Sequence, residues 1–431
     1  MKSKKIIFLE KMLRFMAGTV LNRHRPKIVA ITGSVGKTST KTAVFEVLSK
    51  KYRVRENQKN YNNEIGIPLT IIGAESGGSN VFKWGWVFLK WILALVWTKY
   101  PEVLVLELGV DRPEDMKYFM SFIHPTVSIV TNIGTSHIEF FRNMDNIAKE
   151  KRAIVEALGE EGYAILNMDD ERVKDMQQRT KGQVITFGQT DEATVYASHF
   201  QYNYQDGKPK GISFKLNYDG TSMPIRLPHI LAQHYVYVAL AAAGAGLALK
   251  MNLVEIASAL EQLHTPVGRM NLLEGLKGSI LIDDTYNASP LSTIAALDVL
   301  EKLEAKRRIA VLGDMLELGE QTEIGHRSVG KKIFESKVDL FVGVGKRMEY
   351  AAAELIALGF PASGIMHFID PMAAASGVAG LVEEGDAILV KGSQGMRMEK
   401  VSEALLADQG QTENLLCRQN QAWRKKPFMQ P

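Results

Sequence analysis

The sequence predicts an α/β protein with two sheet domains, and two stretches carry that prediction. From Ile28, the β-branched run IVAIT leads into a glycine loop, GSVGKT, and a helical pattern begins directly after the loop. From Ser279 onward, the apolar runs ILIDD, RRIAVLG, DLFVGVG, IMHFI and AILVKGS alternate with helical stretches. Such alternation is typical of a doubly wound domain. We therefore expect a central domain with a mostly parallel sheet, followed by a C-terminal Rossmann-like domain.

Length and composition describe an ordinary globular chain of 431 residues, of which 46% are hydrophobic and 23% charged. The net charge of +4 is uneven, because residues 1–27 carry +7 and residues 414–431 carry +4, which leaves −7 between them. This distribution predicts no nucleic-acid partner. The single cysteine excludes an intramolecular disulfide and fits a reducing, cytoplasmic location.

Four segments follow from this pattern. We expect a basic amphipathic helix at 1–26, the central domain at 27–266, the C-terminal domain at 267–408, and a polar, basic, loosely held tail at 409–431. Within the central domain, short β-rich runs between 163 and 227 suggest an antiparallel annex to the sheet, and helices are expected at 232–250 and 252–263.

Two segments could either pack within the fold or contact a membrane surface. In the N-terminal helix, Lys11 and Arg14 interrupt an apolar run that is too charged for a secretion signal. Val81 to Thr98 reads VFKWGWVFLKWILALVWT and holds four of the five tryptophans, but Lys83 and Lys90 argue against a membrane span. For both segments packing is our first expectation, and peripheral contact with anionic lipid is the alternative.

The glycine loop has the composition of a polyphosphate site, or P-loop. Glycines let backbone N–H groups converge on phosphate oxygens, and the helix N-terminus adds positive potential. Lys37 adds a charge, and the Thr38 hydroxyl can bind Mg²⁺. The spacing is the short T-G-x-x-G-K-T, because Ile31 stands where the longer motif has its first glycine. The central domain is therefore predicted to be an ATPase domain, with nucleotide contacts from Gly33, Ser34, Val35, Gly36, Lys37, Thr38 and Ser39.

Polar side chains end two further predicted strands, VLVLEL and VSIVT. The first strand carries Glu107 at its end, and the second runs into His137. Functional side chains in open α/β sheets gather at the carboxyl ends of strands, so we expect both residues beside the nucleotide and its metal. The polar loop NYNNEIGIPLT, from Asn60, is either a binding loop or only a turn. A helix at 146–158 carries Lys151, which the pattern alone places on the surface.

Together these motifs resemble those of the Mur ligase family. The stretches that carry the resemblance occur in the family's order across residues 28–404 and are TGSVGKTST, NYNNEIGIPLT, LELG, TNIGTSHIEFF, DDTYNASP, VLGDMLELGEQTEIGH and KGSQGMRME. They favour the branch that joins D-alanyl-D-alanine to UDP-N-acetylmuramoyl-tripeptide in peptidoglycan precursor synthesis. The resemblance implies an ATP-dependent amide ligase that forms an acyl phosphate and then transfers the acyl group to an amine.

The resemblance also implies roles for individual residues. Lys37 would hold the β- and γ-phosphates, Thr38 and Glu107 would bind one Mg²⁺, and His137 would serve a second. Lys151 matches the family lysine that is carbamylated and bridges the metals. Arg269 matches an arginine that reaches the γ-phosphate, and Asp284 and Asn287 would lie against the ribose and base. The remaining substrate contacts would come from Asn60, Asn62, Asn63, Glu64, Asp314, His326, Lys391 and Ser393.

The sequence departs from the family pattern in three places. The family begins with a domain of roughly a hundred residues that binds the uridine nucleotide, whereas this P-loop begins after 32 residues. The pattern G-x-H-N-x-x-N lacks its glycine and both asparagines around His234, and Phe141-Arg142-Asn143 replaces phenylalanine-glycine-serine.

We expect a monomer. Two alternative functions remain: a Mur-like ligase with another acceptor or donor, or a non-catalytic protein that binds ATP.

Overall fold

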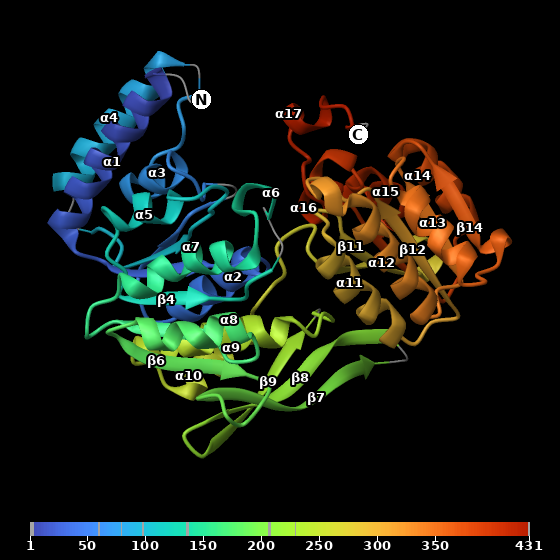
Figure 1. The fold of residues 1–431 in the computed structure, drawn as a ribbon, viewed down its shortest axis with the longest axis horizontal. Coiled ribbons are helices and arrows are strands. Elements are labelled where there is room, and N and C mark those ends of the chain that lie inside the picture. The colour runs from blue at the N-terminus through green and yellow to red at the C-terminus, as the bar shows by residue number, and fades with distance from the viewer. Residues whose placement is uncertain are drawn as a thin grey trace. The chain divides into compact units, whose positions relative to one another are not determined.

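The structure is a computed structural model that describes residues 4–58, 61–78, 80–96, 99–134, 138–205, 208–228 and 230–429. It contains two compact units (Figure 1). The first comprises Met1–Phe200, Phe214–Ile225 and Val236–Leu263, and the second comprises Gln201–Ser213, Arg226–Tyr235 and His264–Pro431. Of the residues in the sequence predictions, Asn60 and His137 lie outside the described residues, as do Trp97 and Thr98 of the tryptophan-rich segment and Thr135 and Ser136 of the motif TNIGTSHIEFF.

Most of a nine-stranded sheet with the order β2-β3-β1-β4-β5-β6-β7-β8-β9 lies in the first unit, and parts of β7, β8 and β9 belong to the second. Pairing is parallel from β2 through β7. The strands are β1 Lys27–Thr32, β2 Val54–Glu56, β3 Val103–Glu107, β4 Val127–Val130, β5 Tyr163–Asn167, β6 Gln183–Gly188, β7 Val195–Gln205, β8 Lys208–Tyr218 and β9 Thr221–Pro228.

One part of the sheet prediction was wrong. The runs YAILN, QVITFG and ATVYASHF, expected in an antiparallel annex, lie in β5, β6 and β7, and each of these strands pairs in parallel with the strand before it. For β5 and β6 the physical reason is the length of the connections that precede them, since a parallel pair needs a crossover of a dozen or more residues. The helices α7 (Met144–Glu156) and α8 (Glu171–Lys174) lie in the two connections.

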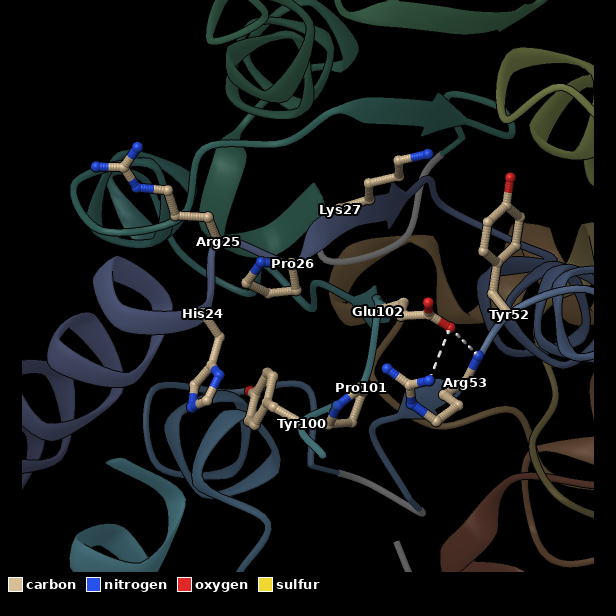
Figure 2. A pocket seen from close by; sticks show the side chains of 9 residues that line it. All are labelled: His24, Arg25, Pro26, Lys27, Tyr52, Arg53, Tyr100, Pro101 and Glu102. Carbon is tan, nitrogen blue, oxygen red and sulfur yellow. Dashed lines mark hydrogen bonds and ion pairs between the residues drawn. The ribbon is translucent and has the colours of Figure 1, made fainter. Parts of the chain in front are cut away.

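The amino ends of β1 and β3 border a pocket of about 390 Å³. Figure 2 shows its lining, which includes Lys27, Tyr52, Arg53, Tyr100 and Glu102. Glu102 accepts a hydrogen bond from the Arg53 backbone N–H at 2.9 Å. Because the glycine loop follows the carboxyl end of β1, this pocket lies at the other end of the strands from the predicted nucleotide site.

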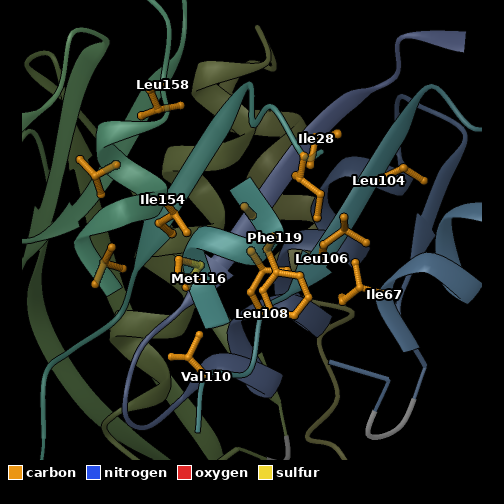
Figure 3. Close-up of a cluster of buried hydrophobic side chains, with 14 of the residues drawn as sticks. Ile28, Ile67, Leu104, Leu106, Leu108, Val110, Met116, Phe119, Ile154 and Leu158 are labelled. Carbon is orange, nitrogen blue, oxygen red and sulfur yellow. The ribbon is translucent and has the colours of Figure 1, made fainter. Parts of the chain in front are cut away.

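A hydrophobic core covers the central strands (Figure 3). Leu104 and Leu106 of β3 pack with Phe119 of α5 (Asp115–Met120) and with Ile154 of α7. The strands β3 and β4 are buried along their whole length, which explains why they read as continuous apolar runs rather than alternating ones. The other helices of this unit are α1 Lys4–His24, α2 Lys37–Ser49, α3 Gly66–Ile72, α4 Val81–Val96, α6 Ile138–Phe141, α9 Tyr235–Ala248 and α10 Leu253–Leu260.

The predicted N-terminal helix and tryptophan-rich helix, α1 and α4, lie side by side in the structure (Figure 1). Leu13 of α1 and Val87 of α4 belong to one buried cluster, and the Trp91 indole N–H donates to the Thr19 hydroxyl at 2.8 Å. Packing within the fold is thus confirmed for one face of each helix. Among the described residues, no helix combines the length and apolar character that crossing a bilayer requires.

The second unit contains a six-stranded sheet with the order β10-β11-β15-β12-β13-β14. All pairs are parallel except β10 with β11, so the expected doubly wound pattern is confirmed and an antiparallel edge strand is added. Its strands are β10 Asn271–Glu274, β11 Ile280–Asp284, β12 Arg307–Gly313, β13 Leu340–Val344, β14 Ile365–Phe368 and β15 Asp386–Lys391. Its helices are α11 Pro290–Lys302, α12 Thr322–Glu335, α13 Met348–Ala357, α14 Pro371–Leu381, α15 Glu399–Leu405, α16 Thr412–Leu415 and α17 Gln421–Arg424.

The tail was expected to be loosely held, and this expectation was wrong for the described residues up to 429. Leu416 and Cys417 are buried, and the Arg418 guanidinium forms a buried ion pair with Glu399 at 2.8 Å. The Met429 N–H donates to the Gly395 carbonyl at 2.8 Å, and the Arg397 guanidinium lies 5.6 Å from the centre of the Trp423 ring. Buried apolar residues and charge pairs therefore anchor a segment that its polar composition suggested was free.

Asp283 of β11 is a fully buried carboxyl that the sequence did not single out. Its Oδ1 accepts hydrogen bonds from the hydroxyls of Ser402 at 2.7 Å and Thr285 at 2.8 Å. Its Oδ2 has no hydrogen-bond partner among the described residues. Burial raises the pKa of Asp283 to about 7, so the folded protein keeps this proton in mildly acidic solution.

The contribution of Asp283 to the free energy of unfolding is therefore expected to fall as pH rises from about 4 to about 7. Over this range folded Asp283 keeps its proton, whereas an unfolded aspartate with a pKa of about 3.9 releases it, so the unfolded state binds fewer protons. Relative to an Asp283→Asn variant, the free energy of unfolding of the wild type should decrease by on the order of 4 kcal/mol between pH 4 and pH 7. It should not decrease further above pH 7. Urea unfolding at pH 4, 5.5 and 7.5 measures this, and parallel pH profiles of the two proteins would contradict it.

Candidate active site

The glycine loop connects β1 to α2 in a conformation that requires its two glycines. Gly33 and Gly36 have positive φ angles of 152° and 82°. A Cβ atom at Gly33 would lie 1.9 Å from the Thr131 hydroxyl oxygen, so no other residue fits there. Helix α2 begins directly after Gly36, at Lys37, so the loop ends at a helix N-terminus as phosphate binding requires.

Residues that follow β4 hold the loop in place. The Ser34 N–H donates to the Asn132 carbonyl oxygen at 2.9 Å, and the Val35 N–H donates to Asn132 Oδ1 at 2.8 Å. The Thr131 hydroxyl donates to the Val35 carbonyl at 2.7 Å. Asn132 is thus a supporting residue to which the sequence reasoning gave no role, although it follows the strand VSIVT directly and lies in the motif TNIGTSHIEFF.

The Lys37 side chain folds back over its own loop. Its ammonium donates to the carbonyl oxygens of Gly33 at 2.8 Å and Ser34 at 3.3 Å. The loop's cation is therefore already held at the glycine turn, where phosphate oxygens would be expected to bind.

Glu107 lies at the end of β3, opposite Ile31 in the parallel pairing with β1. Its side chain is only 3% exposed. Asn62 Nδ2 donates to Oε1 at 3.4 Å, but Oε2 has no hydrogen-bond partner among the described residues. A buried carboxylate oxygen without a partner is costly unless a cation or donor completes its environment. The carboxylate is therefore suited to a metal ion.

A buried asparagine, Asn57, joins the polar loop to the end of β3. Its Oδ1 accepts from the Glu107 N–H at 2.7 Å, and its Nδ2 donates to the carbonyl oxygens of Tyr61 at 3.2 Å and Glu107 at 3.3 Å. The sequence reasoning missed this residue, which lies in a basic, polar strip of the sequence. It fixes the backbone at the point where Glu107 leaves the strand.

The predicted substrate loop lies against the same strand end. Asn62 bonds to Glu107 through its side chain, and its carbonyl accepts from the Gly109 N–H at 2.9 Å. Asn63 Oδ1 accepts from the Gly66 N–H at 2.9 Å and so starts helix α3, while Glu64 is partly buried. The structure thus brings Asn62 to the site and gives Asn63 a structural contact.

Lys151 is buried in α7, with 3% of its surface exposed, so its expected surface position from the pattern alone was wrong. Burial lowers its pKa well below the usual range, and the nearby charge of Lys37 lowers it further, against the opposing effect of Asp111 and Glu150. Lys149, two residues earlier on the same helix, is exposed. The structure thus brings the lysines of the P-loop and of α7 together.

The donor atoms near the loop fit a hard cation. The Glu107 carboxylate and the Thr38 hydroxyl offer oxygen, which Mg²⁺ prefers. Among the described residues, no three His, Cys, Asp or Glu side chains cluster as a metal site. A carbamate on Lys151 would add two further oxygen donors to this set.

The second unit has its own polar cluster at the ends of two adjacent strands. Asp284 of β11 is the register partner of Lys391 of β15, and the Lys391 ammonium lies 2.6 Å from Asp284 Oδ2. The same ammonium donates to the Asn287 carbonyl at 2.8 Å. Arg269 lies with its guanidinium 4.3 Å from the centre of the Tyr286 ring. The structure therefore pairs two residues that the sequence assigned to separate ligands.

Asp314, His326 and Ser393 meet around the loop that follows β12. The Ser393 hydroxyl accepts from the Leu316 N–H at 2.8 Å. Asp314 Oδ1 accepts from the Met348 N–H at 2.9 Å, and burial raises the pKa of Asp314. Its Oδ2 lacks a hydrogen-bond partner among the described residues.

Both ring nitrogens of His326 are engaged inside the protein. Nε2 accepts from the Met315 N–H at 3.0 Å, so Nδ1 carries the proton and donates to the Thr322 carbonyl at 2.6 Å. Burial lowers the pKa of His326 and favours this neutral form. The side chain thus holds the loop that bears Asp314.

Comparisons with known proteins agree with this geometry. The Mur ligase middle domain model matches residues 31–83 and 87–246, and the model of the Mur ligase, glutamate ligase domain matches residues 268–394. The chain belongs to the Mur ligase family. The matched ranges contain the P-loop, Glu107 and Lys151 in the first unit, and Asp284 and Lys391 in the second.

Several relatives of this Mur ligase carry one name, UDP-N-acetylmuramoyl-tripeptide--D-alanyl-D-alanine ligase. The Bacillus subtilis (strain 168) protein is 29% identical over 395 residues, which cover 91% of this chain and 79% of that protein. The Escherichia coli (strain K12) protein is 29% identical, with 90% of this chain and 79% of that protein covered. A crystal structure of MurF from Acinetobacter baumannii matches with a TM-score of 0.75 and 26% identity over 91% of this chain and 79% of that one. The predicted two-domain α/β fold is thus confirmed.

Proposed function

We propose that this Mur ligase joins D-alanyl-D-alanine to UDP-N-acetylmuramoyl-tripeptide, with conversion of ATP to ADP and phosphate. The observation that carries the proposal is the match to relatives of that name over nine-tenths of the chain. The buried site supports it independently, because a P-loop, an unpartnered carboxylate oxygen on Glu107 and a buried lysine lie at one edge of the sheet. A protein that only binds ATP needs no second metal site, to which we assign the buried lysine and His137.

In this proposal the P-loop holds the triphosphate while a carboxylate of the acyl substrate attacks the γ-phosphate. The N–H groups of the loop and the Lys37 ammonium neutralise charge on the phosphates, so phosphoryl transfer proceeds by positioning. The amine of the dipeptide then attacks the acyl phosphate, forms the amide bond and releases phosphate, with loss of a proton from nitrogen. We assign the orientation of the acyl substrate to Asn62, and its hydrogen bond with Glu107 supports this assignment.

We assign one Mg²⁺ to Thr38 and Glu107, and a second to His137, with Lys151 serving both as a carbamate. Bound Mg²⁺ neutralises phosphate charge. Carbamylation joins the Lys151 nitrogen to the carbon of CO₂ and releases one proton. Burial of the lysine and its closeness to Lys37 support this assignment, since both disfavour the ammonium form that cannot react.

In the second unit we assign Asp284 and Asn287 to the ribose and base, and Arg269 to the γ-phosphate. Asp314, Lys391 and Ser393 are assigned to the incoming dipeptide. Because the Lys391 ammonium is already paired with Asp284 at 2.6 Å, a dipeptide carboxylate would have to share that cation. His326, whose ring nitrogens are both engaged, acts as a positioning residue for the Asp314 loop.

We further propose that the protein works as a monomer in the cytoplasm. The surfaces that we assign to peripheral contact with a membrane are the outward faces of α1 and of α4, the described part of the tryptophan-rich segment.

The deciding test is phosphate release from ATP and Mg²⁺ with UDP-N-acetylmuramoyl-tripeptide, with and without D-alanyl-D-alanine. Release is expected only with both substrates, and mass spectrometry should identify the pentapeptide product. A protein that binds ATP but stays inactive with this pair would contradict the proposed substrates. A screen of other acyl acceptors and amino-acid donors would then separate a ligase of different specificity from a protein that only binds ATP.

A further inference from the structure

The outward face of α4 carries an apolar stripe that nothing in its own unit covers among the described residues. Large side chains recur along it at the spacing of one helix face, and all are exposed, from 91% for Phe82 and 56% for Trp86 to 42% for Leu93. The members of the stripe are Phe82, Trp86, Leu89, Leu93 and Val96. The opposite face, with Val87 and Trp91, packs on the protein.

Helix α1 has the same arrangement. Phe8, Met12 and Phe15 follow one another at helical spacing and are exposed, Phe8 by 70% and Phe15 by 64%. Leu13 and Met16, on the inner face, pack with Val87 in the buried cluster. The two neighbouring helices therefore both place large apolar side chains away from the core, and we call the eight exposed residues of the two stripes the α1/α4 surface.

Such a surface is unusual for a protein that stays in water. Large contiguous apolar patches on a protein surface mark interaction sites. Since α4 is 16 residues long and carries two lysines, it is suited to lying along an interface rather than crossing a bilayer.

The charges beside the surface indicate what covers it. Lys4, Lys5 and Lys11 of α1 and Lys83 of α4 are exposed, and the sequences of the two helices contain one acidic residue, Glu10. A second copy of the chain would bring the same positive charges face to face, which is unfavourable. Anionic lipid headgroups would instead pair with them, at roughly 1 kcal/mol for each basic residue near the surface.

We propose that the α1/α4 surface docks on an anionic phospholipid bilayer. The aromatic and aliphatic stripes enter the boundary between headgroups and acyl chains, and the lysines contact the phosphates. This partner is independent of the ligase reaction, because no residue of the P-loop site belongs to the surface.

The test is sedimentation of the full chain with vesicles. Wild-type protein should bind vesicles of phosphatidylglycerol and phosphatidylcholine at least ~10-fold more tightly than vesicles of phosphatidylcholine alone, and 0.5 M salt should weaken the binding. A double variant, Phe82→Glu with Trp86→Glu, should lose at least ~10-fold in affinity for the anionic vesicles. Both positions lie in the first turns of α4, where carboxylates are compatible with a helix.

The matched control changes two exposed apolar residues elsewhere by the same charge, Val254→Glu with Ile356→Glu, and should bind like the wild type. Circular dichroism and phosphate release of both double variants verify folding and keep this test separate from that of the ligase activity. Equal vesicle binding by the wild type and the α4 variant would overturn the proposal. So would a wild type that ignores vesicles and forms a dimer that the α4 variant breaks, since the surface would then be a self-interface.

Discussion

Replacing Lys151 with alanine is expected to lower the ligation rate by at least about 10³-fold while ATP binding remains. The reason is the position of the Lys151 side chain. It is buried near Lys37, at the edge of the sheet where β3 ends with Glu107. In the proposed mechanism its carbamate supplies oxygen donors that other described side chains do not provide. The P-loop, to which we assign most of the contacts to the nucleotide, is untouched by the substitution.

Phosphate release measures the rate, and titration with a fluorescent ATP analogue measures binding. Short carboxylates such as acetate should partly restore the activity of the Lys151→Ala variant, because they can occupy the space of the carbamate. Lys149→Ala, on the exposed side of the same helix, is the matched control and should keep wild-type activity. Normal turnover by the Lys151 variant would remove this residue from the mechanism.

Replacing Glu107 with glutamine is expected to lower the rate by about 10²- to 10⁴-fold without a loss of stability. The amide keeps the size of the side chain and its contact with Asn62, but it removes the charge that a metal ion needs. In the metal-free protein that charge is buried, and its Oε2 lacks a hydrogen-bond partner among the described residues. The free energy of unfolding of the variant should therefore be equal to or above that of the wild type.

Thermal unfolding measures the stability of the Glu107→Gln variant, and phosphate release over a Mg²⁺ titration measures its rate. Glu102→Gln is the control, because Glu102 directly precedes β3 at the end opposite Glu107 and contacts Arg53 at the surface. That variant should keep its activity and lose less than about 1 kcal/mol of stability. A Glu107 variant that was both inactive and strongly destabilised would indicate a structural carboxylate instead.

Much of the fold was predictable because its signals are local. The strands β12 and β15 are buried apolar runs, which predict strands directly. The P-loop is predicted by two glycines, whose positive φ angles other residues rarely adopt. The helix that carries the tryptophans was also predictable, although one face of it packs and the other is exposed. The existence of these elements follows from local sequence alone. Which face of the helix is buried depends on distant parts of the chain.

The candidate site was predictable in part. Strand-end positions placed Glu107 near the P-loop, and the parallel register with β1 confirms that neighbourhood. The supporting residues Asn57 and Asn132 were missed, because a single asparagine in a polar strip or after a strand has no distinctive pattern. Their hydrogen bonds join segments about 50 to 100 residues apart.

The sequence by itself determined the order of strands and helices, the position of the phosphate loop and the family motifs, because periodicity and glycine spacing act over a few residues. Only the tertiary structure decided that Lys151 is buried while Lys149 is exposed, that Asp284 pairs with Lys391, and that the C-terminal tail is anchored. Burial and charge pairing depend on which distant segments pack against a side chain, and no local pattern records that.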